Sequence, residues 1–84
     1  MADDITVYGS DWCPVTQRML KHLDGTGVPY KYVDIDASPD DEQLIAGWNN
    51  GRSIRPSLDV QGDHFVNPDL VELDEDLRRR GLLT

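Results

Sequence analysis

The chain has 84 residues, with sixteen acidic residues against eight lysines and arginines, so its formal net charge is −8 at pH 7. This length predicts one domain, residues 1–84, around one modest hydrophobic core. The negative charge would repel nucleic-acid phosphates and anionic lipids, and the single cysteine excludes an internal disulfide framework and a four-cysteine zinc site.

The first predicted elements are a strand and a helix, joined by the loop that holds the cysteine. Residues 5–8 are β-branched and aromatic, which favours a short strand that stops at Gly9. Val15, Met19 and Leu23 then recur at four-residue spacing, which predicts an amphipathic helix of about three turns. Because these three residues set its apolar face, we expect the cysteine to lie exposed at the start of the helix.

A second strand and helix are predicted next along the chain. Residues 30–35 read "YKYVDI", a pattern typical of a strand. Ser38 is a favoured helix cap, and Pro39 suits the first helical position. The acidic residues 40–42 would then lie at the positive end of the helix dipole. We expect this helix to continue to Trp48, just before an asparagine and glycine run.

A hairpin and a last helix complete the predicted order. Residues 57–61 and 64–66 are expected strands, and Gly62-Asp63 between them suits a two-residue type II′ turn because glycine comes first. Asn67 and Pro68 repeat the pattern of a cap followed by proline. The last helix carries an apolar face of leucines and ends in basic residues that complement its dipole: Leu70, Leu73, Leu77, Arg78, Arg79 and Arg80.

The predicted order of elements is βαβαββα. The first βαβ unit gives parallel strands with a right-handed crossover, while the terminal hairpin adds antiparallel ones. We therefore predict an α/β fold, with a four-stranded mixed sheet and helices on both of its faces. Any active chemistry is expected where the first strand turns into the first helix.

The residues around Cys13 favour a reactive thiolate. Unpaired first-turn amides and the helix dipole stabilise an anion at this junction, and Pro14 at the first helical position has no amide to leave unpaired. The amides of Val15 and Thr16, and the Thr16 hydroxyl, are the expected donors to the sulfur. We therefore expect a lowered thiol pKa. The alternative for a lone cysteine is a buried, structural residue.

Two further features bear on the same loop. Trp12 either covers the thiol or belongs to the core between strand and helix, and both alternatives stay open. The usual zinc ligands are limited to Cys13, His22 and His64, which show no short spacing, so we expect no metal site. A cysteine–histidine nucleophile pair would require a spatial adjacency that the sequence does not specify.

Five stretches of the chain resemble the glutaredoxin family, most of all its short, mycoredoxin-type members: "ITVYG", "SDWCPVT", "PYKYVDID", "NNGRSIRPSL" and "GDHFVNPDLVEL". The resemblance covers nearly the whole chain. It implies a thioredoxin-like fold, a cis peptide before Pro56 facing the thiol, and thiol–disulfide exchange through Cys13. It also implies glutathione or mycothiol as co-substrate, with no tightly bound cofactor.

The chain departs from the family pattern at two positions. Family members usually carry C-x-x-C, or C-G-F-S in the cluster-binding branch, whereas this chain has C-P-V-T with Thr16 at the fourth position. Dithiol chemistry within one chain is therefore excluded. The residue before the family's cis-proline is commonly a small or β-branched one such as valine, but here it is Arg55. This change predicts an extra positive charge in the substrate groove or, alternatively, a side chain that points to solvent.

The resemblance also implies which residues hold the small thiol and which partners it serves. The expected contacts surround the thiol: Trp12, Arg52, Arg55, Pro56, Val66, Asn67 and Asp69. The expected partners are a low-molecular-weight thiol and proteins that carry it as a mixed disulfide. Two other functions stay open, an iron–sulfur cluster carrier built from two chains and a redox-inactive binding module.

The sequence also bears on location. A single cysteine favours a reducing compartment. The first residues, Met-Ala-Asp-Asp, show neither a basic start nor an apolar run, and no stretch reaches the roughly 20 apolar residues of a membrane span. We therefore expect a cytoplasmic, monomeric protein with neither nucleic acid nor membrane as a partner.

Overall fold

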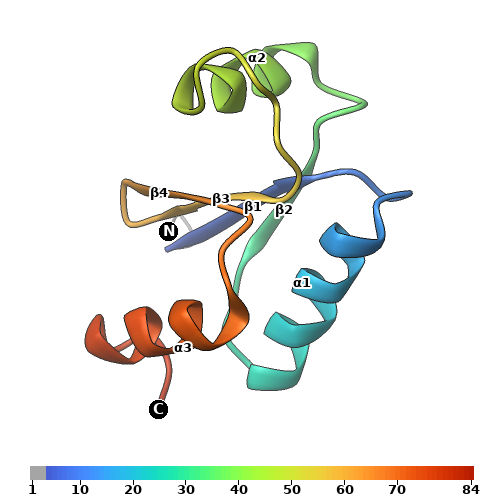
Figure 1. Ribbon diagram of the computed structural model, residues 1–84. Coiled ribbons are helices and arrows are strands. Elements are labelled where there is room, and N and C mark those ends of the chain that lie inside the picture. The colour runs from blue at the N-terminus through green and yellow to red at the C-terminus, as the bar shows by residue number, and fades with distance from the viewer. Residues whose placement is uncertain (1–3) are drawn as a thin grey trace.

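The computed structural model describes residues 4–84 and confirms the predicted order of elements (Figure 1). The elements are β1 (Ile5–Gly9), α1 (Pro14–Thr26), β2 (Lys31–Asp34), α2 (Pro39–Trp48), β3 (Ser57–Val60), β4 (Asp63–Val66) and α3 (Leu70–Arg79). Within residues 4–84, no helix is long and apolar enough to cross a membrane.

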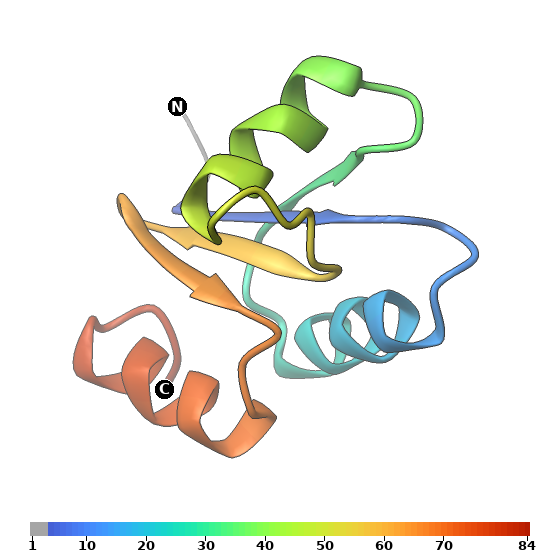
Figure 2. The ribbon, with the colours of Figure 1, turned by 45° about the horizontal axis from the view of Figure 1, so that its top comes forward.

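The four strands form one mixed sheet in the order β2-β1-β3-β4. β1 pairs parallel to β2 and antiparallel to β3, and β3 pairs antiparallel to β4. Helix α2 covers one face of the sheet, while α1 and α3 cover the other (Figures 1 and 2). The prediction of a mixed sheet with helices on both faces is confirmed, and the architecture is the thioredoxin-like one.

The main core lies between the sheet and the helix pair α1 and α3. Alternate residues of the central strands point into it because successive strand side chains face opposite sides. The buried members of this cluster are Ile5, Val7, Met19, Leu23, Val28, Leu58, Val60, Leu73 and Leu77. This packing fixes α1 against β1, and so it fixes the junction that holds Cys13.

An aromatic group covers the opposite face of the sheet beneath α2. The Trp48 ring lies edge-on to Tyr8, with 5.4 Å between ring centroids, and stacks on His64 at 3.8 Å. Trp48 is the last residue of α2. These contacts attach the end of α2 to β1 and β4, because edge-to-face and stacked rings are both favourable arrangements.

The hairpin turn lies one residue earlier than the sequence predicts. Val60 pairs with Asp63, so the two turn residues are Gln61 and Gly62, and the prediction of a Gly62-Asp63 turn is wrong. Both turn residues have positive φ, 53° and 93°, which is the signature of type I′ rather than type II′. Asp63 is instead the first residue of β4.

The start of the last helix also differs from the prediction. Helix α3 begins at Leu70 and its cap is Asp69, whose carboxylate accepts a hydrogen bond from the Glu72 amide at 3.2 Å. Asn67, the predicted cap, instead has a φ of 43° and lies in the turn before Pro68. An aspartate cap and an asparagine in the left-handed region are each favourable, so the local sequence is compatible with either start.

Arg80 attaches the end of α3 to the hairpin. Its guanidinium donates to Asp76, one turn earlier, and to Asp63 in β4, both at 2.7 Å. It also lies over the Phe65 ring, 6.0 Å from the centroid. Hydrogen bonds from Arg80 lower the pKa of Asp76. The arginine run therefore closes the helix as predicted, and one of its members also joins two elements.

Replacing Arg80 with alanine should lower the free energy of unfolding by about 1–2 kcal/mol, because hydrogen bonds between charged groups are lost and the Asp76 carboxylate keeps fewer partners. The matched control is Arg79→Ala, since Arg79 also pairs with Asp76 but its side chain is 73% exposed; its effect should stay below about 0.5 kcal/mol. Urea unfolding of both variants measures the difference, and equal losses would contradict the assignment.

The pH dependence of the Arg80 effect has a definite sign. Because the pKa of Asp76 is lowered in the folded state, its contribution to stability is present above the ordinary carboxyl pKa and is lost as pH falls through the folded value. The stability gap between wild type and Arg80→Ala should therefore narrow in acid.

Candidate active site

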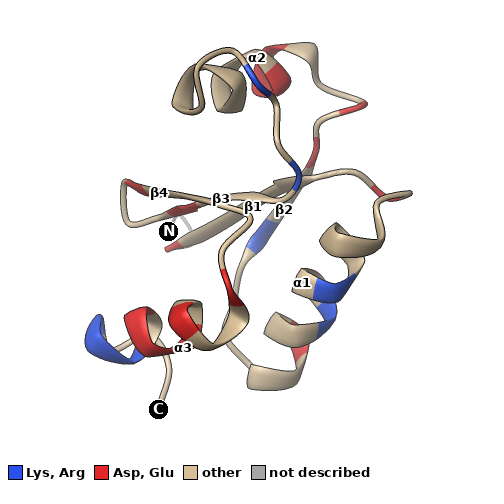
Figure 3. Cartoon of the chain, viewed as in Figure 1, with Lys and Arg blue, Asp and Glu red and all other residues tan. Residues whose placement is uncertain are grey.

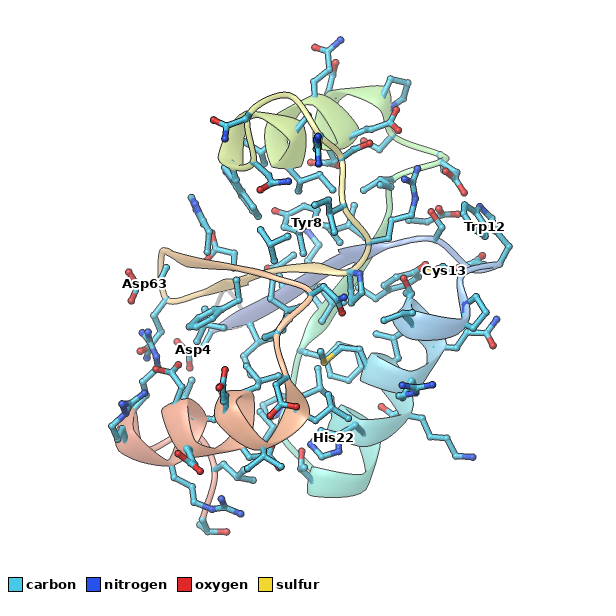
Figure 4. The ribbon with its side chains drawn as sticks, viewed as in Figure 1. Asp4, Tyr8, Trp12, Cys13, His22 and Asp63 are labelled. Carbon is cyan, nitrogen blue, oxygen red and sulfur yellow. The ribbon has the colours of Figure 1, made fainter. Side chains whose placement is uncertain are left out.

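Cys13 is the residue that caps α1, at the end of the loop leaving β1 (Figure 4). Its amide donates to the Ser10 carbonyl at 3.1 Å, and its carbonyl accepts from the Gln17 amide at 3.0 Å, the first hydrogen bond of the helix. Pro14 occupies the first helical position, as predicted. This geometry fixes the Cys13 backbone from both sides.

The thiol is less accessible than the sequence predicts. Only 8% of Cys13 is exposed, so the expectation of an exposed position is wrong. The reason lies in the rotation of α1, whose buried face consists of Thr16, Met19 and Leu23. Val15, expected on that face, is 37% exposed. Spacings of three and four residues both describe one helix face, so the apolar pattern alone did not fix the first turn.

Local hydrogen bonds and a nearby charge set the acidity of the thiol. Burial, the largest single influence, raises the pKa of the Cys13 thiol. The amide and hydroxyl of Thr16 and the amide of Val15 act in the opposite direction because they donate to the sulfur, and the charge of Arg55 adds to them. Together these groups outweigh burial, and the pKa is lowered below its ordinary value, in the direction expected from the sequence.

Thr16 is held by close packing against β1. Its side chain is fully buried, and its hydroxyl oxygen accepts a hydrogen bond from the Ser10 amide at 3.4 Å. A methyl group at Gly9 would overlap the Thr16 side chain. Glycine at the end of β1 is therefore what allows the hydroxyl to approach the loop that holds the thiol.

Arg55 is part of the site, but its charge is matched by acidic groups. Its guanidinium pairs with Asp36 and Glu42, each at 3.2 Å, and its Nε donates to the Ser10 hydroxyl. The side chain is 19% exposed, so the alternative in which it points to solvent is wrong. Because Asp36 and Glu42 share this guanidinium, they offset part of the extra positive charge that the sequence predicts near the thiol.

Trp12 lies at the surface beside the thiol. It is 65% exposed, so the alternative of a core residue is wrong. Its indole N–H donates to Asp36 at 2.6 Å, and the Arg55 guanidinium lies 5.6 Å from the ring centroid. Trp12 projects from the same loop as Cys13 (Figure 4).

Pro56 lies at the same end of the sheet. The peptide bond between Arg55 and Pro56 is cis, as the resemblance implies, and Pro56 is buried. Tyr8 pairs with Ser57 across β1 and β3. Pro56 therefore lies beside the end of β1 from which the Cys13 loop departs.

A shallow groove of about 390 Å³ runs between α1 and the corner from β4 to α3. Three predicted residues line it, Asn67 and Asp69 from the corner and Val15 from the first turn of α1. Arg18 also lines it and was not predicted, although its position one turn after Pro14 places it on the same helix side as Val15. Arg18 makes no ion pair within residues 4–84.

The remaining predicted residues lie outside this groove. Val66 ends β4 and is half-buried, and Arg52 is exposed in the loop before β3. Neither lines the groove. In the part of the chain that the structure describes, no three histidine, cysteine, aspartate or glutamate side chains gather in a way that could hold a metal ion.

Comparison with known proteins agrees with this geometry. Residues 5–65 match the glutaredoxin family, which is most of the chain. This chain belongs to the glutaredoxin family. Mycoredoxin 1 from Corynebacterium glutamicum is 32% identical over 71 residues, which cover 83% of this chain and 87% of that protein.

Solved glutaredoxin structures share the fold. Glutaredoxin C1 from Populus tremula x tremuloides, in its holo form, has a TM-score of 0.72 and 25% identity, over 95% of this chain and 82% of that one. The glutaredoxin from Archaeoglobus fulgidus has a TM-score of 0.73 at 22% identity, over 90% and 87%. By family and fold, the protein is a glutaredoxin-like thiol oxidoreductase whose partners are thiols and protein disulfides.

Replacing Gly9 with alanine should lower the free energy of unfolding by about 1–3 kcal/mol, because the new methyl group displaces the buried Thr16 side chain. Gly47→Ala is the matched control: a methyl group at this helical position meets open space, and it should stabilise the protein by about 0.5–1 kcal/mol. Chemical denaturation measures both, and a neutral Gly9→Ala would refute the close packing.

Replacing Thr16 with valine should raise the pKa of the Cys13 thiol, because the shape is kept while the hydroxyl donor is lost. Thr16→Ser keeps the hydroxyl and should preserve the lowered pKa. The rate of alkylation by iodoacetamide against pH reports each value. An unchanged midpoint in Thr16→Val would show that the hydroxyl does not act on the sulfur.

The same shift predicts how stability changes with pH. Because the folded thiol has the lower pKa, the thiolate's contribution is present above the ordinary thiol pKa and is lost as pH falls through the folded value. Relative to Cys13→Ser, the wild type should therefore gain stability as pH rises across this interval.

Proposed function

We propose that this glutaredoxin is a monothiol oxidoreductase that transfers a low-molecular-weight thiol from protein mixed disulfides through Cys13. The observation that carries the proposal is the arrangement of the C-P-V-T segment. The chain has one cysteine, and the residue three positions later is a buried threonine whose hydroxyl donates to the sulfur. Thr16 therefore supports the thiolate instead of supplying a second thiol.

The reaction proceeds by two exchanges. The Cys13 thiolate attacks the small-thiol sulfur of a mixed disulfide; one S–S bond forms as another breaks, and the substrate protein leaves as a thiolate that takes a proton. A second small thiol, deprotonated to a thiolate, then attacks the adduct and restores Cys13 with release of the small-molecule disulfide. A nucleophile with a pKa near ambient pH favours such exchange.

The small thiol is proposed to be glutathione or mycothiol, used as co-substrate without any tightly bound cofactor. One relative has the name Mycoredoxin 1, and a buckwheat glutaredoxin of the same fold has been solved as a glutathione complex. The groove between α1 and the β4–α3 corner, lined by Asn67 and Asp69, is the proposed seat of this molecule. Pro56 and Val66 lie outside the groove, and their proposed contacts with the small thiol rest on the family resemblance. Arg18 lines the groove, and neither Arg18 nor Arg52 makes an ion pair within residues 4–84.

The electrostatics of the site support this assignment. Arg55 lowers the pKa of Cys13, so its proposed role is to stabilise the thiolate. Because Asp36 and Glu42 hold its guanidinium, a carboxylate of the co-substrate would have to compete with them for it. We assign the protein to the cytoplasm and to a monomeric state for this activity.

Cys13→Ser should abolish the exchange while leaving the fold intact, because serine is also a favoured helix cap. The assay follows release of the small thiol from a mixed disulfide, and circular dichroism checks the fold. A mass spectrum of the wild type, purified without reductant, should show one small-thiol adduct whose mass identifies the co-substrate. Full activity in Cys13→Ser would remove the proposed nucleophile.

A further inference from the structure

Trp12 combines high exposure with a fixed orientation. It is 65% exposed, which is unusual for the largest apolar side chain. Yet its indole N–H donates to the Asp36 carboxylate at 2.6 Å, and its ring lies beside the Arg55 guanidinium, 5.6 Å from the centroid. An exposed tryptophan that is held in place loses little conformational entropy when it binds another surface.

The groups that hold Trp12 are themselves fixed. Asp36 accepts from both the indole and Arg55, and its own amide donates to the Asp34 carboxylate at 3.0 Å. Arg55 in turn donates to the Ser10 hydroxyl and the Ser53 carbonyl. The ring is therefore attached, through Arg55 and Asp36, to the end of β1 and to the loop before β3, and not only to its own loop.

The position of Trp12 determines what can reach it. It directly precedes Cys13, so the two Cα atoms are about 3.8 Å apart. A protein that carries a mixed disulfide must bring its own sulfur to within bonding distance of the sulfur that Cys13 attacks. The chain flanking that sulfur must then cover surface next to the thiol. The small-thiol half is proposed to occupy the groove between α1 and the β4–α3 corner, which Val15 and Asn67 line and Trp12 does not.

The charge around Trp12 indicates the chemistry of the covering segment. Acidic residues gather on the loop from β2 to α2 and at the start of α2 (Figure 3), and one of them, Asp36, contacts Trp12. Asp36 accepts the hydrogen bond of the indole N–H, and Asp11, the residue before Trp12 in the chain, accepts one from the Tyr32 hydroxyl. An aromatic face within an acidic surround favours aliphatic and cationic side chains, because the ring attracts both.

We propose that Trp12, oriented by Asp36, is the docking residue for the protein half of the mixed disulfide, and that it binds an aliphatic or basic side chain beside the substrate cysteine. Trp12 acts by contact, and Asp36 is a positioning residue. The proposal rests on the proposed exchange at Cys13 and adds a basis for choosing among protein substrates. It assigns Trp12 to the protein half instead of the small thiol.

The test compares three mixed disulfides of one small thiol. In the first, the small thiol is joined to mercaptoethanol. In the second it is joined to a cysteine peptide with leucine and lysine beside the cysteine. In the third it is joined to a peptide of equal length with glycine and glutamate at those positions. Trp12→Ala should lower kcat/KM for the leucine–lysine peptide about tenfold and change the mercaptoethanol reaction less than about twofold. The glycine–glutamate peptide should already react slowly with wild type.

The control is Val71→Ala, since Val71 is 64% exposed, nearly the same as Trp12, and lies on α3. It should leave all three reactions unchanged. For each variant, the ratio of peptide to mercaptoethanol rates cancels the fraction of Cys13 that is ionised. A change in thiol pKa therefore cannot imitate a docking effect.

Asp36→Ala tests the positioning role. In a Trp48→Phe background, where Trp12 is the only tryptophan, fluorescence anisotropy should fall as the indole loses its acceptor. The ratio of peptide to mercaptoethanol rates should fall with it, by less than in Trp12→Ala.

The possible results separate this proposal from the proposed function. Equal losses with mercaptoethanol and peptide in Trp12→Ala would make Trp12 a contact of the small thiol and overturn the docking role. No loss with either substrate would also overturn it. Equal losses with the two peptides would overturn the preference for an aliphatic or basic side chain beside the substrate cysteine. If the wild type exchanged none of the three, the function itself would fail.

Discussion

The contact between the Thr16 side chain and the backbone of Gly9 determines the rest of the site. It joins the first turn of α1 to the end of β1 and leaves the hydroxyl between the Ser10 amide and the Cys13 sulfur. The hydrophobic cluster beneath this contact packs α1 against the sheet, so the short distance between Thr16 and Gly9 depends on the whole core. Cys13 thereby receives its donors from a rigid element, and little reorganisation is required when the thiolate forms.

In this strongly acidic protein, two arginines each pair with two nearby carboxylates. Arg55 forms ion pairs with Asp36 and Glu42, and its charge also helps to lower the pKa of Cys13. Arg80 forms ion pairs with Asp76 and Asp63 at the opposite end of the sheet. Both arginines join segments distant in sequence. The two arginines differ in what lies near them. Arg55 lies close enough to Cys13 to affect the pKa of its thiol, whereas Arg80 only joins α3 to the hairpin.

The order of elements was predictable because the helix and strand periods, glycines and prolines agree with each other along the chain. The lowered pKa of the Cys13 thiol and its Thr16 donor were also predictable, since the two residues are neighbours at the start of one helix. Longer-range features were not. The indole of Trp12 is oriented by a hydrogen bond to Asp36, 24 residues away, and the partners of Arg55 come from three separate segments. The hairpin turn was misplaced because Gly62 suits either position of a two-residue turn.

The threonine at position 16 has a consequence for how the protein responds to its surroundings. A dithiol that closes on itself releases two small thiols for each disulfide consumed, so its oxidised share depends on the absolute size of the thiol pool. Under the proposed exchange, the adduct on Cys13 forms with release of a single small thiol. Its equilibrium share then follows only the ratio of disulfide to thiol, and diluting the whole pool leaves that share unchanged.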